Sequence, residues 1–241
     1  MVSKAPENLK ARLKESYDAI APAYNEWTAQ HSELRLLYLD KLIQLLDPPT
    51  AEAPGDSDTP NQGPQLNVVE LGCGAGIPVT EKLVADPRRR FHVTANDIST
   101  AQLDLAKSRF DPKGEAPVVW VQGDMLDLRF PEASVDAVIA MYSIIHLPRD
   151  EQDKMLVHIR SWLRSGGYAL INFSAEEMEG LVMEKWLDER GWMYWSGWGA
   201  EGALAKVREA GLEVVSAEVV DDVTDASFLW VIARKPLAVA G

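Results

Sequence analysis

Short apolar segments alternate with amphipathic segments from Leu66 onward, a pattern typical of buried parallel strands joined by helices. Helical spacing is clearest in 149–163, where Met155 and Ile159 share one face and the glycine pair 166–167 is expected to end the helix. The pattern predicts strands at 67–71, 91–95, 118–122, 135–141, 168–173, 213–220 and 228–234, and helices at 79–85, 100–110, 149–163 and 202–210. We therefore expect an α/β fold with a seven-stranded, mostly parallel sheet and helices on both faces.

The chain before this region is predicted to be helical. Residues 7–46 carry apolar side chains at helical spacing, and breaks are expected near Pro22 and in the polar stretch around His31. We expect residues 1–46 to form an N-terminal helical lid on the core that follows.

Two other segments differ from their surroundings. Residues 47–65 hold five prolines among glycine, aspartate, serine and threonine, which predicts a flexible loop. Residues 66–241 are expected to form the core, with an aromatic-rich insertion at about 176–200.

Charge and composition exclude several classes of protein. The 37 acidic residues outnumber the 24 basic ones, and a net charge of −13 opposes binding to nucleic acid or to an anionic membrane. The single cysteine, Cys73, excludes an intramolecular disulfide, and the polar start of the sequence lacks the apolar core of a secretory signal. We expect a cytoplasmic protein without a metal site, because the four histidines lack metal-ligand spacing: His31, His92, His146 and His158.

A glycine-rich turn is the strongest chemical signal. The strand predicted at 67–71 runs into Gly72-Cys73-Gly74-Ala75-Gly76 and then into a helix. Such glycines let the backbone approach a ligand closely. A dinucleotide fingerprint would place a glycine at position 77, where this chain has Ile77. The spacing therefore disfavours a dinucleotide, and a tight turn without a ligand is the simpler alternative.

The sequence Glu70-x-Gly72-x-Gly74-x-Gly76 resembles the first motif of the class I S-adenosylmethionine-dependent methyltransferases. The resemblance implies a Rossmann-like fold that binds S-adenosylmethionine and releases S-adenosylhomocysteine. It also implies that the three glycines pass under the methionine part of the cofactor and that Glu70 helps to place the ammonium group.

Two further carboxylates follow predicted strands. By the resemblance, Asp97 accepts hydrogen bonds from the ribose hydroxyls, with Ile98 against the adenine. Asp124 then accepts from the adenine amino group and Met125 packs on the ring. The position of Asp97 is shared with dinucleotide-binding folds, and an aspartate such as Asp124 can equally cap a turn.

The N-terminal segment from 16 to 24 is similar to that of many small-molecule methyltransferases, including quinone C-methyltransferases. In those enzymes the tyrosines reach over the cofactor and the acceptor. Tyr17 and Tyr24 are seven residues apart and share one helical face. We expect Tyr17 to contact the cofactor and Tyr24 to assist catalysis, although both rings could simply anchor the helix.

Residues after the fourth predicted strand face cofactor and acceptor in this family. Met141 is therefore expected at the cofactor and Tyr142 at the acceptor. His146 is the candidate general base, because imidazole titrates near neutral pH. The alternative is that His146 fixes the loop through a backbone hydrogen bond.

The insertion concentrates five aromatic residues within 186–198: Trp186, Trp192, Tyr194, Trp195 and Trp198. Such an insertion commonly roofs the acceptor pocket, so Trp195 and Trp198 are candidate substrate contacts. The aromatic rings favour an apolar or aromatic acceptor, and they could also hold a cationic amine. The alternatives are a helical flap and a dimer contact.

The resulting hypothesis is a methyltransferase that acts on a small apolar or aromatic metabolite, as a monomer or homodimer. A catalytically silent cofactor-binding protein or partner subunit of the same fold is one alternative. An NAD(P)-dependent oxidoreductase is another, opposed by Ile77 and by the absence of a lysine four residues after Tyr142. The Asn/Asp-Pro-Pro-Tyr motif of amino-directed enzymes is absent, since Met141-Tyr142-Ser143-Ile144 occupies its place.

Overall fold

The structure is a computed structural model, and it describes residues 5–46, 65–87, 90–114, 117–222 and 226–238. All but the last residue of the predicted loop 47–65 lies outside these residues. Within the described ranges, no helix is both long enough and apolar enough to cross a membrane.

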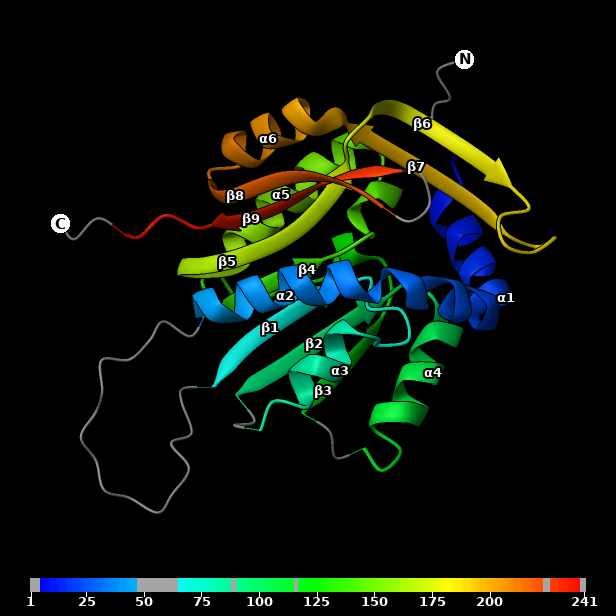
Figure 1. Cartoon of the computed structure of the whole chain (residues 1–241), viewed down its shortest axis with the longest axis horizontal. Coiled ribbons are helices and arrows are strands. Elements are labelled where there is room, and N and C mark those ends of the chain that lie inside the picture. The colour runs from blue at the N-terminus through cyan, green and yellow to red at the C-terminus, as the bar shows by residue number, and fades with distance from the viewer. Residues whose placement is uncertain (1–4, 47–64, 88–89, 115–116, 223–225, 239–241) are drawn as a thin grey trace.

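Seven strands form one sheet in the order β3-β2-β1-β4-β5-β9-β8 (Figure 1). The strands are β1 (Leu66–Leu71), β2 (Phe91–Asp97), β3 (Val118–Gln122), β4 (Val135–Ala140), β5 (Leu163–Ser174), β8 (Glu213–Asp221) and β9 (Ser227–Arg234). Strands β1 to β5 pair in parallel, and β9 runs antiparallel between β5 and β8. The predicted mostly parallel, Rossmann-like sheet is confirmed.

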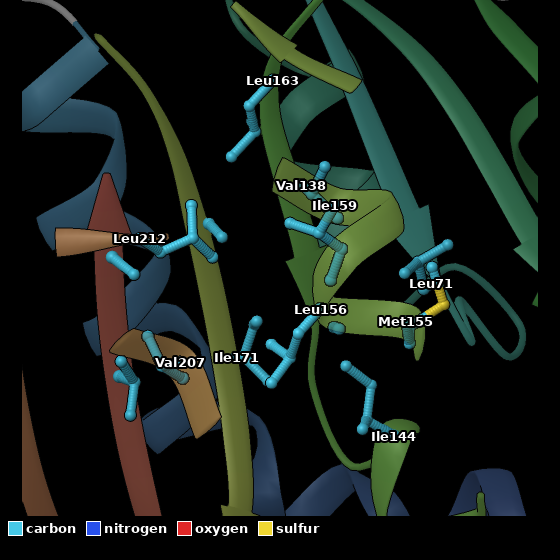
Figure 2. Close-up of a cluster of buried hydrophobic side chains, with 14 of the residues drawn as sticks. Leu71, Val138, Ile144, Met155, Leu156, Ile159, Leu163, Ile171, Val207 and Leu212 are labelled. Atoms are coloured by element: carbon cyan, nitrogen blue, oxygen red, sulfur yellow. The ribbon is translucent and has the colours of Figure 1, made fainter. Parts of the chain in front are cut away.

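Helices cover both faces of this sheet (Figure 1). They are α1 (Leu9–Thr28), α2 (Ser32–Leu46), α3 (Val79–Val84), α4 (Thr100–Phe110), α5 (Arg149–Trp162) and α6 (Gly199–Glu209), with short 3₁₀ turns η1 (Ala29–His31), η2 (Met125–Asp127) and η3 (Ile144–His146). Neighbouring strand residues point to opposite faces. Val138 packs with α5 and α6, as Figure 2 shows for part of that cluster, and Ile139 packs with α2, α3 and α4.

One predicted helix break and one predicted helix end are wrong. Helix α1 continues through Pro22, where a break was expected, because Ile20 and Ala21 beside it are buried and α1 packs on α4 and β7. Helix α5 ends at Trp162 rather than at the glycine pair, since Leu163 already pairs with Val135 of β4 as the first residue of β5. The predicted break around His31 is confirmed by η1.

The aromatic insertion is a β-hairpin and not a helical flap. Strands β6 (Glu177–Glu184) and β7 (Trp192–Trp198) pair antiparallel in a separate two-stranded sheet. Strand β7 is buried on both sides, with Trp192, Met193 and Tyr194 packed on α1. Burial on both sides removes the alternation of apolar and polar residues that would have indicated a strand.

Candidate active site

The glycine turn lies where β1 ends, beside the carboxyl ends of β2 and β4. Gly72 has a φ of +74°, and a side chain there would place its Cβ 2.5 Å from Cβ of Ser143. Gly74 is more open, because the nearest atoms to such a Cβ are 3.9 Å away on Gln102 and 4.0 Å away on Tyr24. A Cβ added at Gly76 would lie 2.8 Å from Cε2 of Phe110 in α4, and Gly76 does not line the cleft described below. Of the three glycines, Gly72 and Gly74 therefore reach the site.

Asp97 joins the glycine turn to the start of α4. Its Oδ2 accepts a hydrogen bond from N of Gly74 at 2.8 Å, and its Oδ1 accepts from N of Ser99 at 2.8 Å. Burial raises the pKa of Asp97 to about 6, and these backbone hydrogen bonds oppose the rise. The carboxylate is mostly ionised at neutral pH and fixed in position at the edge of the cleft.

Glu70 is buried beneath the turn. Its Oε2 accepts a hydrogen bond from Oγ1 of Thr80 at 2.5 Å. Burial raises the pKa of Glu70 to about 8, while the Thr80 hydrogen bond and the charge of Arg35 oppose the rise. Glu70 is therefore mostly protonated at neutral pH, and a cation placed beside it would ionise it.

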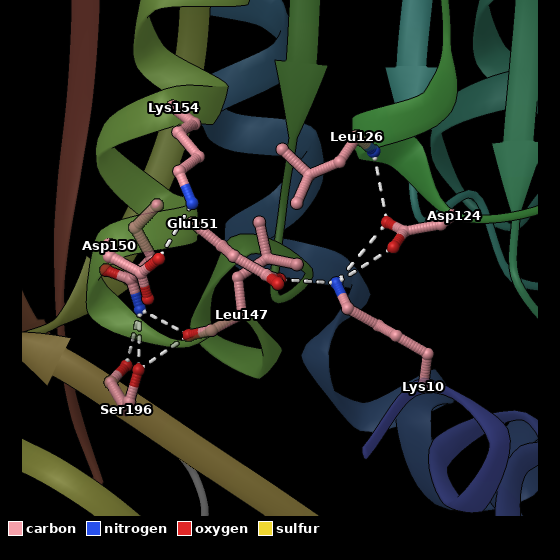
Figure 3. Close-up of polar contacts among 9 residues, drawn as sticks. Lys10, Asp124, Leu126, Leu147, Asp150, Glu151, Lys154 and Ser196 are labelled. Atoms are coloured by element: carbon pink, nitrogen blue, oxygen red, sulfur yellow. Dashed lines mark hydrogen bonds and ion pairs between the residues drawn. The ribbon is translucent and has the colours of Figure 1, made fainter. Parts of the chain in front are cut away.

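A cleft runs from the glycine turn along the ends of β2 and β3. Five of the predicted cofactor residues line it besides Gly72 and Gly74: Tyr17, Asp97, Ile98, Asp124 and Met125. Nζ of Lys10, from α1, lies 3.1 Å from Asp124 and 2.7 Å from Glu151 (Figure 3). Oδ1 of Asp124 also accepts from N of Leu126, so the capping alternative holds alongside any ligand contact. Helix α1 is thus tied to the floor of the cleft.

His146 is held from both sides. Its Nδ1 lies 2.8 Å from the carbonyl oxygen of Tyr194 and its Nε2 lies 2.9 Å from the hydroxyl of Tyr17. A carbonyl only accepts, so Nδ1 carries the proton and Nε2 accepts from Tyr17. Burial lowers the pKa of His146 to about 4, which keeps the ring neutral. The loop-fixing role expected as the alternative is present, and the basic nitrogen is directed at Tyr17.

Tyr24 lines three neighbouring spaces. Its ring packs edge-on against Tyr17, with centroids 5.2 Å apart. It lines the cleft, a smaller neighbouring pocket with Glu70 and Met141, and a larger cavity with Tyr142. Tyr24 is therefore the side chain at which these three spaces meet.

The larger cavity has a volume of about 310 Å³ and aromatic walls. Its rings come from the N-terminal helix, the hairpin and the sheet: Tyr24, Trp27, Tyr142, Trp186, Trp195 and Phe228. Tyr142 and Trp195 were predicted as substrate contacts. Trp198 lies outside the cavity, because its ring stacks under Arg149 and Lys206, with Cζ of Arg149 4.7 Å from the ring centroid.

One end of the cavity is polar, and the sequence did not indicate it. Nδ1 of His31 lies 2.8 Å from Oδ1 of Asp222, and the hydroxyl of Tyr142 donates to Oδ2 of Asp222 at 3.0 Å. Arg35 lines the same end and donates to Oγ1 of Thr28 at 2.7 Å. Among the described residues, no cluster of histidine, cysteine, aspartate and glutamate is arranged to hold a metal ion.

Comparisons with known proteins identify a methyltransferase domain in the chain. A family model described as a methyltransferase domain matches residues 68–167. The chain is similar to the O-methyltransferase rstn1 of Aspergillus nomiae, with 29% identity over 100 residues that cover 41% of this chain and 42% of that protein. It is also similar to the carboxy-S-adenosyl-L-methionine synthase of Aeromonas salmonicida, with 27% identity over 132 residues that cover 52% of each. The chain thus spans about half the length of these relatives. Residues 68–167 thus match a methyltransferase domain, and the relatives support a class I S-adenosylmethionine-dependent methyltransferase.

A solved methyltransferase shares the fold of this chain along nearly its whole length. The structure of 1,6-didemethyltoxoflavin-N1-methyltransferase from Burkholderia thailandensis, with 1,6-didemethyltoxoflavin and S-adenosylhomocysteine bound, superposes with a TM-score of 0.69. The sequences are 18% identical, and the match covers 98% of this chain and 92% of that chain. These comparisons favour neither an oxidoreductase nor a silent binding protein. The narrower similarity to quinone C-methyltransferases stays a prediction.

The cleft fits the cofactor of the family, S-adenosylmethionine. Gly74 leaves its backbone open, and Asp97 and Asp124 place two carboxylates along the cleft. Buried Glu70 lines a neighbouring pocket together with Met141 and Arg35. Arg35 was not predicted from the sequence, and it lines the aromatic cavity as well as this pocket. Its position on an otherwise ordinary helix gave no signal.

Proposed function

We propose that this chain transfers the methyl group of S-adenosylmethionine to a small acceptor with a planar, apolar or aromatic body. One observation carries the proposal: the cofactor cleft and the aromatic cavity share Tyr17, Tyr24, Tyr142 and His146 as a common wall. A ligand in the cleft and a ligand in the cavity would therefore lie next to each other at those four side chains. Such contact is what an in-line displacement requires.

When bound, S-adenosylmethionine supplies a methyl group carried on a cationic sulfur. The chain would mainly bind and align the reactants. Ionised Glu70 would hold the ammonium group, Asp97 the ribose hydroxyls, and Asp124 the adenine amino group. Tyr24, at the junction of the three spaces, would align the acceptor with the methyl group.

His146, the candidate general base, is proposed to act through Tyr17. Its Nε2 accepts the hydrogen bond of the Tyr17 hydroxyl, so a proton leaving an acceptor could reach His146 only by way of Tyr17. Its low pKa, about 4, makes it a weak base. We therefore assign His146 mainly to positioning Tyr17 over the cleft.

The N-terminal helices are proposed to act as the lid. Helix α1 supplies Lys10, Tyr17 and Tyr24 to the cleft, and its contacts with Asp124 and His146 hold it closed. Closure would exclude water from the reacting atoms. We also propose a cytoplasmic location and a monomeric or homodimeric state, in keeping with the acidic composition and the single cysteine.

The test is a screen for methyl transfer. The purified chain is incubated with S-adenosylmethionine and a panel of planar aromatic phenols, amines and thiols, and S-adenosylhomocysteine and methylated product are measured by mass spectrometry. Trp186→Ala should lower kcat/KM for a true acceptor at least tenfold, about 1.4 kcal/mol, because Trp186 forms part of the cavity wall.

Trp198→Ala is the matched control, since Trp198 comes from the same hairpin and lies outside the cavity. It should leave the KM for the acceptor near that of the parent chain. Equal losses in both variants, or loss of S-adenosylmethionine binding in Trp186→Ala alone, would contradict the placement of the acceptor.

A further inference from the structure

We propose that His31 and Asp222 form a proton-accepting pair in the aromatic cavity, and that the acceptor carries an acidic hydroxyl such as that of a phenol or enol. The inference rests on the proposed methyl transfer and names the class of acceptor. It is carried by the cavity, by the geometry of the pair and by an unpartnered nitrogen.

The pair joins two distant parts of the chain. His31 lies in η1 between the two N-terminal helices, and Asp222 follows β8, 191 residues later. Nδ1 of His31 is 2.8 Å from Oδ1 and 3.0 Å from Oδ2 of Asp222, and both side chains are 2% exposed. Because a carboxylate only accepts, Nδ1 carries its proton and Nε2 presents its lone pair.

That lone pair has no partner in the part of the chain that the structure describes. Nε2 of His31 is buried without a hydrogen bond, and His31 lines the aromatic cavity. Burying a polar atom without a hydrogen-bond partner is unfavourable, because the atom loses its hydrogen bonds to water and gains none in return. A ligand hydroxyl in the cavity would supply the missing donor.

His31 differs in this respect from His146, the other histidine of the cavity. Nε2 of His146 already accepts a hydrogen bond from Tyr17. Nε2 of His31 remains available, and its Nδ1 is bound to a carboxylate, which stabilises the ring once it is protonated. Of the two histidines, His31 is therefore the one whose lone pair can accept a hydrogen bond from a ligand in the cavity.

The groups that face His31 suit an oxyanion. Arg35 brings a guanidinium to the same end of the cavity, with Cζ 4.9 Å from the centroid of the Tyr142 ring. Nε of Arg35 has no hydrogen-bond partner among the described residues. Tyr142 donates to Asp222, and Glu176 is the other carboxylate lining the cavity. A cation beside the base favours an acceptor that becomes negative when it loses its proton.

The neighbouring rings favour a planar acceptor. Trp27 packs on His31 with ring centroids 4.4 Å apart, and it meets Trp186 at 5.2 Å. A hydroxyl group at His31 would belong to a body lying against these indoles. The cavity thus combines an apolar surface for an aromatic ring with a base at one end.

The acceptor O–H proton passes to Nε2 of His31, and the imidazolium is held by Asp222. The oxygen then bonds to the methyl carbon of S-adenosylmethionine as the carbon–sulfur bond breaks, and the electron pair stays on sulfur in S-adenosylhomocysteine. The imidazolium returns its proton to water after product leaves.

The test uses 4-nitrophenol, whose ionised form has its own absorbance band. With the chain in excess, at a pH below the pKa of the free phenol, the bound probe should show the nitrophenolate band. We expect its ratio of ionised to neutral form to rise roughly tenfold or more, which is one pKa unit. His31→Gln and Asp222→Asn should each abolish the rise.

Two variants are used because either change of a buried pair could unfold the chain, and circular dichroism checks each one. The matched control is His92→Gln, since His92 is exposed on β2, and it should keep the full band. A probe that stays neutral when bound, a probe that fails to bind, or a band that survives in both folded variants would overturn the proposal. Calorimetry with S-adenosylmethionine, run separately, reports on the methyltransferase proposal itself and so distinguishes the two failures.

Discussion

The hydroxyl of Tyr17 lies 2.9 Å from Nε2 of His146, and this hydrogen bond ties the N-terminal helix to the turn that follows β4. On its other side, the His146 ring donates to the carbonyl of Tyr194 in the hairpin. One neutral imidazole thus joins three segments that are far apart in the sequence. Its protonation would break the contact that directs Tyr17 over the cleft.

Acid should therefore destabilise the chain through His146. Its pKa falls from the ordinary 6.5 to about 4 because burial disfavours the charged ring. The unfolded chain binds the extra proton first, so this contribution is complete above pH 6.5 and is lost as the pH falls toward 4. We expect the parent chain to lose about 2 kcal/mol more than His146→Gln across that window, measured by urea unfolding. Parallel losses in the two proteins would contradict the assignment.

Cofactor binding should release a proton from Glu70. Its pKa of about 8 means that it is mostly protonated in the free chain at neutral pH, and a nearby ammonium group would ionise it. Calorimetric titration with S-adenosylmethionine in two buffers of different ionisation enthalpy should show nearly one proton released. Glu70→Gln should remove most of this release, whereas Glu81→Gln, an exposed glutamate on α3, should not. Equal heats in both buffers for the parent chain would show that Glu70 is not at the ammonium group.

The glycines of the turn should differ in their tolerance of a methyl group. Gly72→Ala combines a φ of +74° with a 2.5 Å approach to Ser143, so we expect a loss of about 3 kcal/mol in the free energy of unfolding. Gly74→Ala meets no atom closer than 3.9 Å and should cost about 1 kcal/mol from its φ alone. For cofactor affinity we expect the opposite order, with the larger loss in Gly74→Ala, because Gly74 borders the open cleft. Chemical denaturation and calorimetry measure the two effects, and equal stability losses would count against this geometry.

The ion pairs of Lys10 should affect the rate at which ligand enters and leaves the cleft more than they affect the free energy of unfolding. Lys10 and its partners Asp124 and Glu151 are partly exposed, so Lys10→Met should change the free energy of unfolding by less than about 1 kcal/mol. Losing two anchors of α1 should speed association and dissociation of S-adenosylhomocysteine severalfold in stopped-flow tryptophan fluorescence. Lys14→Met is the control, because Lys14 pairs within its own helix. Unchanged rates in Lys10→Met would refute a lid role for this end of α1.

The sheet and the cofactor cleft could be predicted because their signals are local. The spacing from Glu70 to Gly74 follows from the needs of one turn, Asp97 is the last residue of β2, and Asp124 comes two residues after β3. Parallel pairing then brings these carboxyl ends to one edge without further information. Gly76 belongs to the same motif but serves the packing of Phe110.

The acceptor cavity could be predicted only in part, because tertiary packing builds it. His31 and Asp222 are 191 positions apart in the sequence, and no pattern between them would indicate their contact. The aromatic residues of β7 gave no strand signal, since the strand is buried on both sides. Trp195 and Trp198 looked alike in the sequence, yet the hairpin turns one toward the cavity and the other toward Arg149.

The most direct test of the central claim is calorimetric titration of the purified chain with S-adenosylmethionine and S-adenosylhomocysteine, alongside Asp97→Ala. Asp104→Ala, an exposed aspartate on the neighbouring helix, is the matched control. Saturable binding of both ligands that Asp97→Ala weakens about tenfold or more and Asp104→Ala leaves unchanged is the predicted result. Absence of binding by the folded parent chain, or equal affinity in Asp97→Ala, would contradict the assignment of this cleft to the cofactor.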